Sequence, residues 1–140
     1  MRSNEWGYLL EQRATASGIH FANACVDGTN GMLIFPDDWD GSVSFSNPDH
    51  YSSDFSQNTV NAPEWENLQS TGVAFLPAAG IRMEGTLTGY VQSGGVYWAS
   101  NPSSNDMAYT MYFIVGEKQR SVDANYRNLG ASVRLVKAFQ

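Results

Sequence analysis

The second half of the chain, from Gly72 onward, is a succession of short apolar segments separated by turn residues, and this pattern limits the possible folds most. Segments of this length, rich in Val, Ile, Tyr, Phe and Trp, are typical of β-strands. The predicted strands are VAFLPAAG (73–80), broken by Pro77, the short hairpin IRMEGTLTGYV (81–91) around Glu84-Gly85, then GGVYWAS (94–100), MAYTMYFIV (107–115), QRSVDA (119–124) and ASVRLVK (131–137). Because Asn-, Ser- and Gly-rich turns join them, the sequence predicts an antiparallel meander.

The first half carries two helix patterns. SNEWGYLLEQR (3–13) predicts a short helix with Ser3 as its N-cap and Trp6, Leu9 and Leu10 on one face. A second helix is predicted to begin at Asn61, because a glutamate three residues later completes a capping box. A proline at an early helical position fits this start, and the helix is expected to stop before Gly72.

A hairpin is predicted between these helices. HFANACV (20–26) and GMLIFP (31–36) flank the turn sequence DGTNG (27–31), which is strong hairpin chemistry. The polar stretch 37–59, rich in Ser and interrupted by Gly and Pro, predicts a long surface loop. With no linker composition anywhere, the chain is expected to form one domain, residues 1–140, of the α+β class with two short helices and a mostly antiparallel sheet.

Composition excludes several function classes. The net charge is −6 and the 8 Lys and Arg residues form no basic run, so nucleic-acid binding is not expected. The single cysteine, Cys25, excludes an internal disulfide and a cysteine-based zinc site, and it is expected to be a small core residue. No apolar stretch is long enough to insert into a membrane. With no signal peptide after Met1, the chain is either cytoplasmic or a piece of a longer, exported protein.

The sequence provides no credible catalytic group. His20 and Cys25, five residues apart on one predicted strand, point to opposite faces, and His50 lies in the predicted loop. Glu64 with Glu66, and Asp106 with Glu117, have no fixed separation that would pair them for glycoside hydrolysis. We therefore expect no catalytic residue and no cofactor.

The acidic stretch DDWDG (37–41) is the one candidate for a metal ion. Its carboxylates could bind calcium, but the alternate ligand positions and closing glutamate of an EF-hand are missing. A turn rich in Asx residues explains the same letters. No metal site is assigned, and calcium near Asp37–Asp40 stays open at this point.

A set of polar and aromatic residues after Trp98 is the candidate ligand surface. Aromatic rings anchor protein contacts or stack on sugar rings, while short amide and hydroxyl side chains supply adaptable hydrogen bonds. Trp98 and Phe113 are expected to be core, and the loop residues to be exposed. The predicted ligand-binding residues are Asn101, Ser103, Asn105, Tyr109, Tyr112, Gln119, Asn125, Tyr126 and Asn128.

The last predicted strand raises a separate question, because Arg134 lies among β-branched residues. A guanidinium in such a strand is either half exposed or buried and paired, since burying it alone is costly.

Five blocks of the sequence carry a family resemblance: NEWGYLLEQR (4–13), MLIFPDDWDG (32–41), EWENLQSTGVAFLPAAGIR (64–82), GGVYWASNPSSNDMAYTMYF (94–113) and SVRLVK (132–137). In order and spacing they resemble the Fibrobacter succinogenes major paralogous domain family of Bacteroidetes surface proteins. More distantly, they are similar to C-type-lectin-like folds, including formylglycine-generating-enzyme-like domains and the variable proteins of diversity-generating retroelements. The resemblance implies a C-terminal sheet that displays the ligand, with Arg134 as a framework residue and Trp98 as a structural one.

The chain departs from these families in three ways. It starts at the first helix, without the Gly- and Trp-rich segment that usually precedes it. It lacks the lectin calcium motifs Glu-Pro-Asn and Trp-Asn-Asp, and it lacks the disulfides of animal lectins. With Cys25 alone, the cysteine chemistry of formylglycine-generating enzymes is not implied either.

The function predicted from these observations is non-catalytic ligand binding, by an adhesin or receptor-binding domain. Whether the domain is diversified stays open at this point. The partner is expected to be a protein or a carbohydrate. The resemblance places the domain outside the cell, on the bacterial surface or on a phage particle, as part of a longer or processed chain. The alternatives are a structural repeat unit of a surface or phage-tail protein, and an accessory domain of a carbohydrate enzyme.

Overall fold

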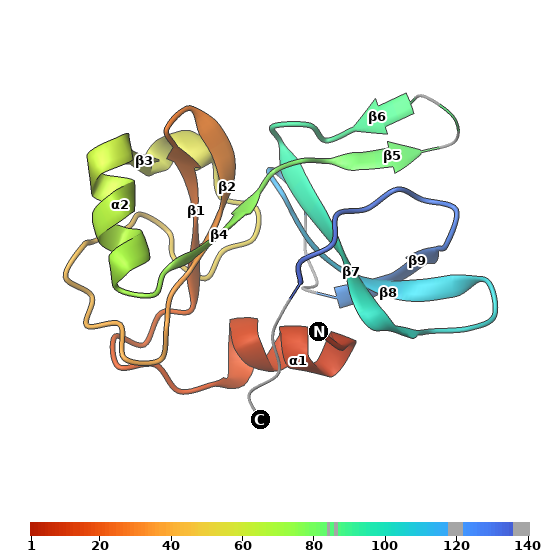
Figure 1. Cartoon of the computed structure of the whole chain (residues 1–140), viewed down its shortest axis with the longest axis horizontal. Coiled ribbons are helices and arrows are strands. Elements are labelled where there is room, and N and C mark those ends of the chain that lie inside the picture. The colour runs from red at the N-terminus through yellow and green to blue at the C-terminus, as the bar shows by residue number, and fades with distance from the viewer. Residues whose placement is uncertain (84, 86, 118–121, 136–140) are drawn as a thin grey trace.

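The chain adopts an α+β fold with two short helices and mostly antiparallel sheets (Figure 1), as the sequence predicts. A computed structural model describes residues 1–83, 85, 87–117 and 122–135. The strands form a four-stranded sheet, a two-stranded hairpin and a three-stranded sheet. In Figure 1 the four-stranded sheet lies on the left, the other strands lie on the right, and α1 runs below them.

The predicted first hairpin forms the centre of the four-stranded sheet, whose order is β3-β1-β2-β4. Strands β1 (Phe21–Val26) and β2 (Thr29–Ile34) are antiparallel, and the turn between them places Asp27 and Gly28 at φ 45° and 78°. Two successive positive φ angles define the turn that matches the twist of a tight hairpin, which explains the Asp-Gly pair. β3 (Thr59–Val60) runs parallel to β1, and β4 (Ala74–Pro77) runs antiparallel to β2.

The two predicted helices are also present. α1 (Ser3–Gly7) continues into a π-helical turn, η1 (Tyr8–Gln12), and Ser3 is its first helical residue rather than its N-cap, which is Arg2. α2 (Ala62–Ser70) begins with the predicted capping box: the Asn61 side chain accepts a hydrogen bond from the Glu64 amide, and the Glu64 carboxylate accepts one from the Asn61 amide. The polar stretch before it is a long loop that contains only a 3₁₀ turn, η2 (Phe55–Gln57).

The second half is predicted to form one meander, but its strands are divided between three sheets, because β4 pairs with β2. β5 (Ile81–Met83) and β6 (Leu87–Gly89) form the short hairpin. β7 (Gly94–Pro102), β8 (Met107–Ile114) and β9 (Val122–Tyr126) form the three-stranded antiparallel sheet, in chain order. The first residues of the predicted strand 119–124 lie outside the described residues.

The predicted closing strand, 131–137, is wrong for the part that the structure describes. Residues 130–135 make only isolated bridges, in which Gly130 pairs with Arg82 and Ser132 pairs with Tyr97. Ser132 exchanges main-chain hydrogen bonds with β7, donating to the Val96 carbonyl and accepting from the Trp98 amide. The C-terminal segment therefore extends the three-stranded sheet by a single point of contact beside β7.

The core is divided by the four-stranded sheet, which is covered on both faces. Met32 and Ile34 of β2 face a large cluster shared with α1 and the three-stranded sheet, whereas Leu33 and Phe35 face a second cluster under α2. This double burial explains the unbroken apolar run MLIF, because a strand covered on both faces has no polar side. None of the helices in the described part of the chain is long and apolar enough to span a bilayer.

Candidate functional site

The three-stranded sheet divides the predicted ligand-binding residues between its two faces. In the register of β8 and β9, Tyr109 lies opposite Ala124, and Ala108 lies opposite Asn125. Because side chains alternate along a strand, Tyr109 and Tyr126 share the face toward α1, and Tyr112 and Asn125 share the other. The nine predicted residues therefore do not form one surface.

The face away from α1 carries a cleft of about 250 Å³, which we call the outer-face cleft. Tyr112 and Asn125, both predicted to bind ligand, lie in its wall. The Asn125 amide donates a 2.6 Å hydrogen bond to the Thr110 hydroxyl, which is fully buried, so its side chain is held against the sheet. The cleft is lined by Ile81, Met83, Tyr90, Val96, Tyr112, Ile114, Asp123, Asn125 and Leu129.

The β5–β6 hairpin provides one side of this cleft, and none of its residues is among those predicted to bind ligand. Tyr90, Val91 and Met83 are 43%, 55% and 39% exposed, which is unusual for large apolar side chains. Tyr90 lies at φ 61°, in the left-handed region that non-glycine residues rarely adopt. The signal available in the sequence was an apolar pair, Tyr90-Val91, inside a turn bounded by glycines, where no strand needs it.

The opposite face serves mainly to seat α1. Tyr109 is partly buried against the large core cluster, so its ring has a packing role. The Asn101 amide group is engaged with Ser3: its oxygen accepts from the Ser3 amide at 2.7 Å, and its nitrogen donates to the Ser3 hydroxyl at 3.0 Å. Of the predicted residues that the structure describes on this face, Tyr126 is the large side chain that is exposed, at 63%.

The remaining predicted residues lie in the loops at the ends of the strands. Ser103, Asn105 and Asn128 are exposed, as expected for loop residues. Gln119 lies outside the described residues.

The residues predicted to lie in the core differ in their burial. Phe113 is fully buried, which confirms its assignment to the core. Trp98 is only partly buried, so the prediction that it is a core residue is wrong. The alternation of β7 places its neighbour Tyr97 in the core instead, 4% exposed, where the hydroxyl donates to the Pro77 carbonyl at 2.8 Å.

Arg134 is exposed, which fits the half-exposed alternative for a guanidinium in this segment. Burial raises the pKa of Tyr97 to about 12, and the nearby positive charge of Arg134 opposes that shift. Arg134 therefore lies close enough to Tyr97 to act on it electrostatically.

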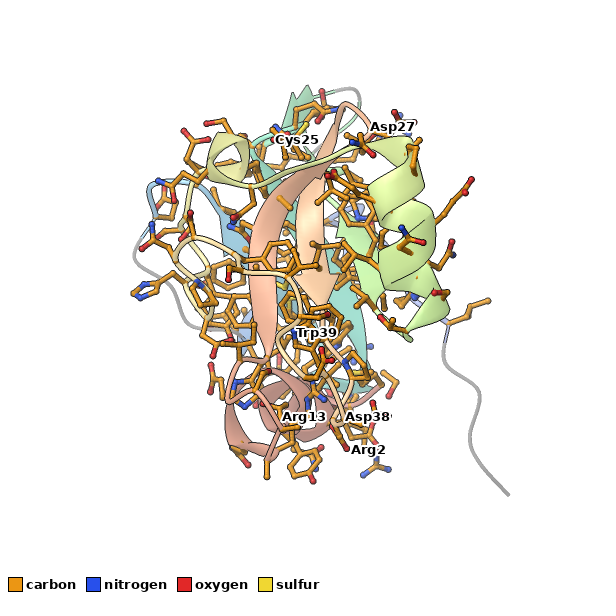
Figure 2. The ribbon with its side chains drawn as sticks, turned by 90° about the vertical axis from the view of Figure 1, so that its left-hand side faces the viewer. Arg2, Arg13, Cys25, Asp27, Asp38 and Trp39 are labelled. Carbon is orange, nitrogen blue, oxygen red and sulfur yellow. The ribbon has the colours of Figure 1, made fainter. Side chains whose placement is uncertain are left out.

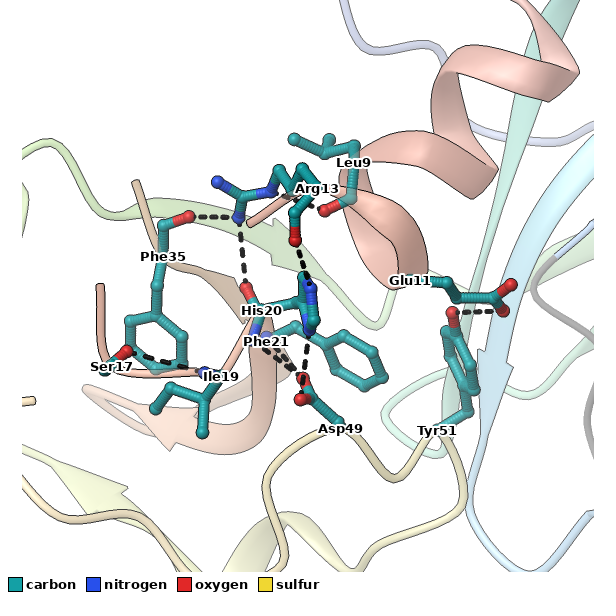
Figure 3. A network of polar contacts seen from close by, with 10 residues as sticks. All are labelled: Leu9, Glu11, Arg13, Ser17, Ile19, His20, Phe21, Phe35, Asp49 and Tyr51. Carbon is teal, nitrogen blue, oxygen red and sulfur yellow. Dashed lines mark hydrogen bonds and ion pairs between the residues drawn. The ribbon is translucent and has the colours of Figure 1, made fainter. Parts of the chain in front are cut away.

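A histidine and an aspartate do meet, but in a structural network (Figure 3). His20 Nδ1 lies 3.1 Å from Asp49 Oδ2, and Nε2 lies 2.9 Å from the Arg13 carbonyl oxygen. Each ring nitrogen of His20 therefore faces an oxygen of the protein, and the ring is held within the network. Asp49 also accepts hydrogen bonds from the main-chain amides of His20 and Phe21, at 2.8 and 3.0 Å.

Arg13 is the centre of this network and is 6% exposed. Its guanidinium donates to the carbonyls of Leu9 and Phe35 and pairs with Asp37. A buried guanidinium needs such a full set of acceptors. The network ties the end of η1 to the hairpin of β1 and β2.

The acidic stretch around Trp39 does not gather its carboxylates. Asp37 pairs with Arg13, and Trp39 is buried, whereas Asp40 accepts a 2.8 Å hydrogen bond from the Ser42 amide. That hydrogen bond lowers the pKa of Asp40 and is an Asx turn within the loop. Among the described residues, no three His, Cys, Asp or Glu side chains are placed to hold a metal ion.

Cys25 is partly buried on β1, between the fully and nearly fully buried residues Ala24 and Val26. The prediction that Cys25 is a core residue is therefore met only in part, although both of its neighbours are core residues. Cys25 is a free thiol and lies opposite Thr59 of β3.

Residues 47–136 match a protein family described as a domain of unknown function, DUF8237. The chain belongs to this family. No curated protein and no solved structure matches the chain at a significant level. The DUF8237 region contains the entire outer-face cleft, from Ile81 to Leu129. It does not contain β1 and β2, although β3 and β4 of the region pair with these two strands.

Proposed function

We propose that the protein is a non-catalytic ligand-binding domain whose ligand occupies the outer-face cleft and the β5–β6 hairpin beside it. The observation that carries this proposal is the exposure of Met83, Tyr90 and Val91 next to Tyr112 and Asn125. Monomeric proteins seldom leave a group of large apolar side chains exposed without using it. Tyrosine and methionine are also enriched at the centres of protein interfaces.

The ligand that this surface suits best is another protein. The cleft of about 250 Å³ is smaller than ordinary small-molecule pockets, and the exposed side chains of Met83 and Tyr90 at its edge are joined by Val91, which does not line it. Among the described lining residues Asp123 alone is charged, so a neutral, partly apolar epitope is the matching chemistry.

Three further features of the proposal rest on the family resemblance in the sequence. We infer a C-type-lectin-like arrangement, kinship with the Fibrobacter succinogenes major paralogous domain family, and a location on the cell surface or a phage particle. The resemblance and the polar, aromatic C-terminal sheet support these inferences. Recovery of the native protein from the cytoplasm alone would count against the location.

The absence of catalysis is supported by the contacts of both His20 ring nitrogens with protein oxygens and by the separation of the carboxylates in the acidic stretch. The check is a screen of hydrolase and transferase substrates. Turnover that disappears on His20→Ala, or on substitution of one carboxylate, would refute this part of the proposal.

Site-specific photo-crosslinking tests the binding surface. A benzoylphenylalanine residue at Tyr90 is irradiated in the native cell, with the same group at Gln69, exposed on α2, as the control. We expect one discrete crosslinked protein from position 90 and none from position 69. No crosslink from position 90, or the same products from both positions, would contradict the proposal.

A further inference from the structure

A second cavity lies on the other half of the molecule, between α2 and the loop that precedes η2. Its volume is about 430 Å³, within the range of sites for small molecules. Figure 1 places α2 at the far left and β7, β8 and β9 at the right, so this cavity is remote from the outer-face cleft. We call it the α2 cavity.

Three segments form the walls of the α2 cavity. Glu64, Asn67, Leu68 and Thr71 line it from α2, at the spacing of one helical face. Facing them are residues of the loop 39–46 and of the segment 57–60. Leu68 and Val60 are 4% and 6% exposed, so they are buried residues that form part of an apolar wall.

The polar groups of the cavity are almost all neutral. Serine and threonine hydroxyls and the amides of Gln57 and Asn67 surround the apolar wall. Among the described residues of the lining, Glu64 alone is charged, and its carboxylate already accepts a hydrogen bond from the Asn61 amide. With no Lys or Arg in the lining, the cavity does not suit a phosphate or a carboxylate ligand.

Two aromatic residues, Phe45 and Trp39, line the cavity beside this wall. Phe45, partly buried, packs on Phe35, and Trp39 stacks on Phe35 with ring centroids 5.2 Å apart. The Trp39 indole N–H is buried and has no hydrogen-bond partner among the described residues. That nitrogen has less than 1 Å² of accessible surface, so Trp39 lines the cavity with its ring and not with its N–H. Figure 2 looks onto this side of the molecule and labels Trp39.

We propose that the α2 cavity binds a neutral sugar. One apolar ring face would lie against Phe45 and Leu68, and the hydroxyls would meet the amides and hydroxyls of the rim. This site is separate from the proposed protein-binding surface and does not depend on it.

The test is a titration of the full chain, labelled with ¹⁵N, with the methyl glycosides of glucose, galactose, mannose and N-acetylglucosamine. The reporter is the indole N–H signal of Trp39, assigned through Trp39→Phe. We expect one of these glycosides to shift that signal in a saturable way. Inorganic phosphate and indole serve as the anionic and purely apolar probes, and neither should compete with the glycoside.

Two exposed residues of α2 supply matched variants for the same titration. Asn67→Ala should weaken binding of the glycoside at least fivefold, whereas Gln69→Ala, which does not line the cavity, should leave it unchanged. No shift of the Trp39 signal with any of the four glycosides, or a shift with phosphate or indole alone, would overturn the proposal. Equal weakening by both variants would overturn it as well.

Discussion

Replacing Arg13 by methionine should destabilise the protein strongly, although Arg13 forms a single ion pair and its partner is exposed. The variant keeps most of the apolar stem and removes the guanidinium, leaving the carbonyls of Leu9 and Phe35 without their donor. A buried acceptor left unsatisfied costs about 1–3 kcal/mol. For the two carbonyls together, the expected loss of unfolding free energy is about 2–6 kcal/mol.

The matched variant is Asp37→Ala, which removes the other partner of the ion pair. The Arg13 side chain is 4% exposed and that of Asp37 is 74% exposed, so water can take the place of the lost carboxylate at the open end of the pair, and the expected loss is about 1 kcal/mol. Equilibrium unfolding of both variants in urea, at constant m-value, measures the two losses directly. If Asp37→Ala costs as much as Arg13→Met, or if Arg13→Met costs less than 1 kcal/mol, on the order of one weak hydrogen bond, the reasoning is refuted.

Three further predictions concern the fold. Because burial raises the pKa of Tyr97 to about 12, the unfolded chain loses this proton first, near pH 10, and stability falls as the pH rises from 10 toward 12. Between pH 9 and pH 11 the unfolding free energy, measured in urea, should therefore fall by about 1 kcal/mol more in the native chain than in Tyr97→Phe. An equal fall in the two proteins would contradict the raised pKa of Tyr97. Residues 47–136 expressed alone should give no cooperative unfolding transition, because β3 and β4 pair with the two strands that this piece lacks; a sharp transition would show that the family region is autonomous. Gly31→Ala places a Cβ 2.4 Å from the Leu76 carbonyl oxygen and should cost about 1–3 kcal/mol, whereas Gly7→Ala in α1 should cost nothing, as thermal unfolding of the two variants will show.

The parts of the fold that could be predicted are those fixed by local chemistry. The Asp-Gly turn of the first hairpin needs two positive φ angles, and the Asn61–Glu64 capping box satisfies the first amides of α2. Both are decided by neighbouring residues, so the sequence shows them directly. The same holds for the exposure of Ser103, Asn105 and Asn128 in turns.

The parts that could not be predicted depend on the register and on what covers each face. YW at 97–98 offers two aromatic residues to opposite faces, and no local signal says that Tyr97 rather than Trp98 faces the core. The composition of the segment predicts that Tyr109 and Tyr112 both bind the ligand, but their odd separation along one strand puts them on opposite faces. The closing segment has strand composition, yet in the described residues it meets β7 only at Ser132.

Asn101 illustrates the same limit at long range. Its side-chain amide forms hydrogen bonds with Ser3, 98 residues earlier, and no residue near Asn101 in the sequence indicates that partner. The exposed Tyr90 belongs to the outer-face cleft for a similar reason, because β5 and β6 are placed beside β7 by the fold.

The most direct test of the proposed function is the affinity for the partner that crosslinking at position 90 identifies. Tyr90→Ala and Tyr8→Ala each remove a tyrosine of similar exposure, 43% and 57%, but Tyr8 lies on η1, away from the outer-face cleft. Calorimetric titration should give a Kd about 5- to 150-fold higher for Tyr90→Ala, the effect of removing an interface anchor of about 1–3 kcal/mol. Tyr8→Ala should bind like the native chain. An unchanged Kd for Tyr90→Ala, or equal losses for the two variants, would contradict the assignment of the ligand to this face.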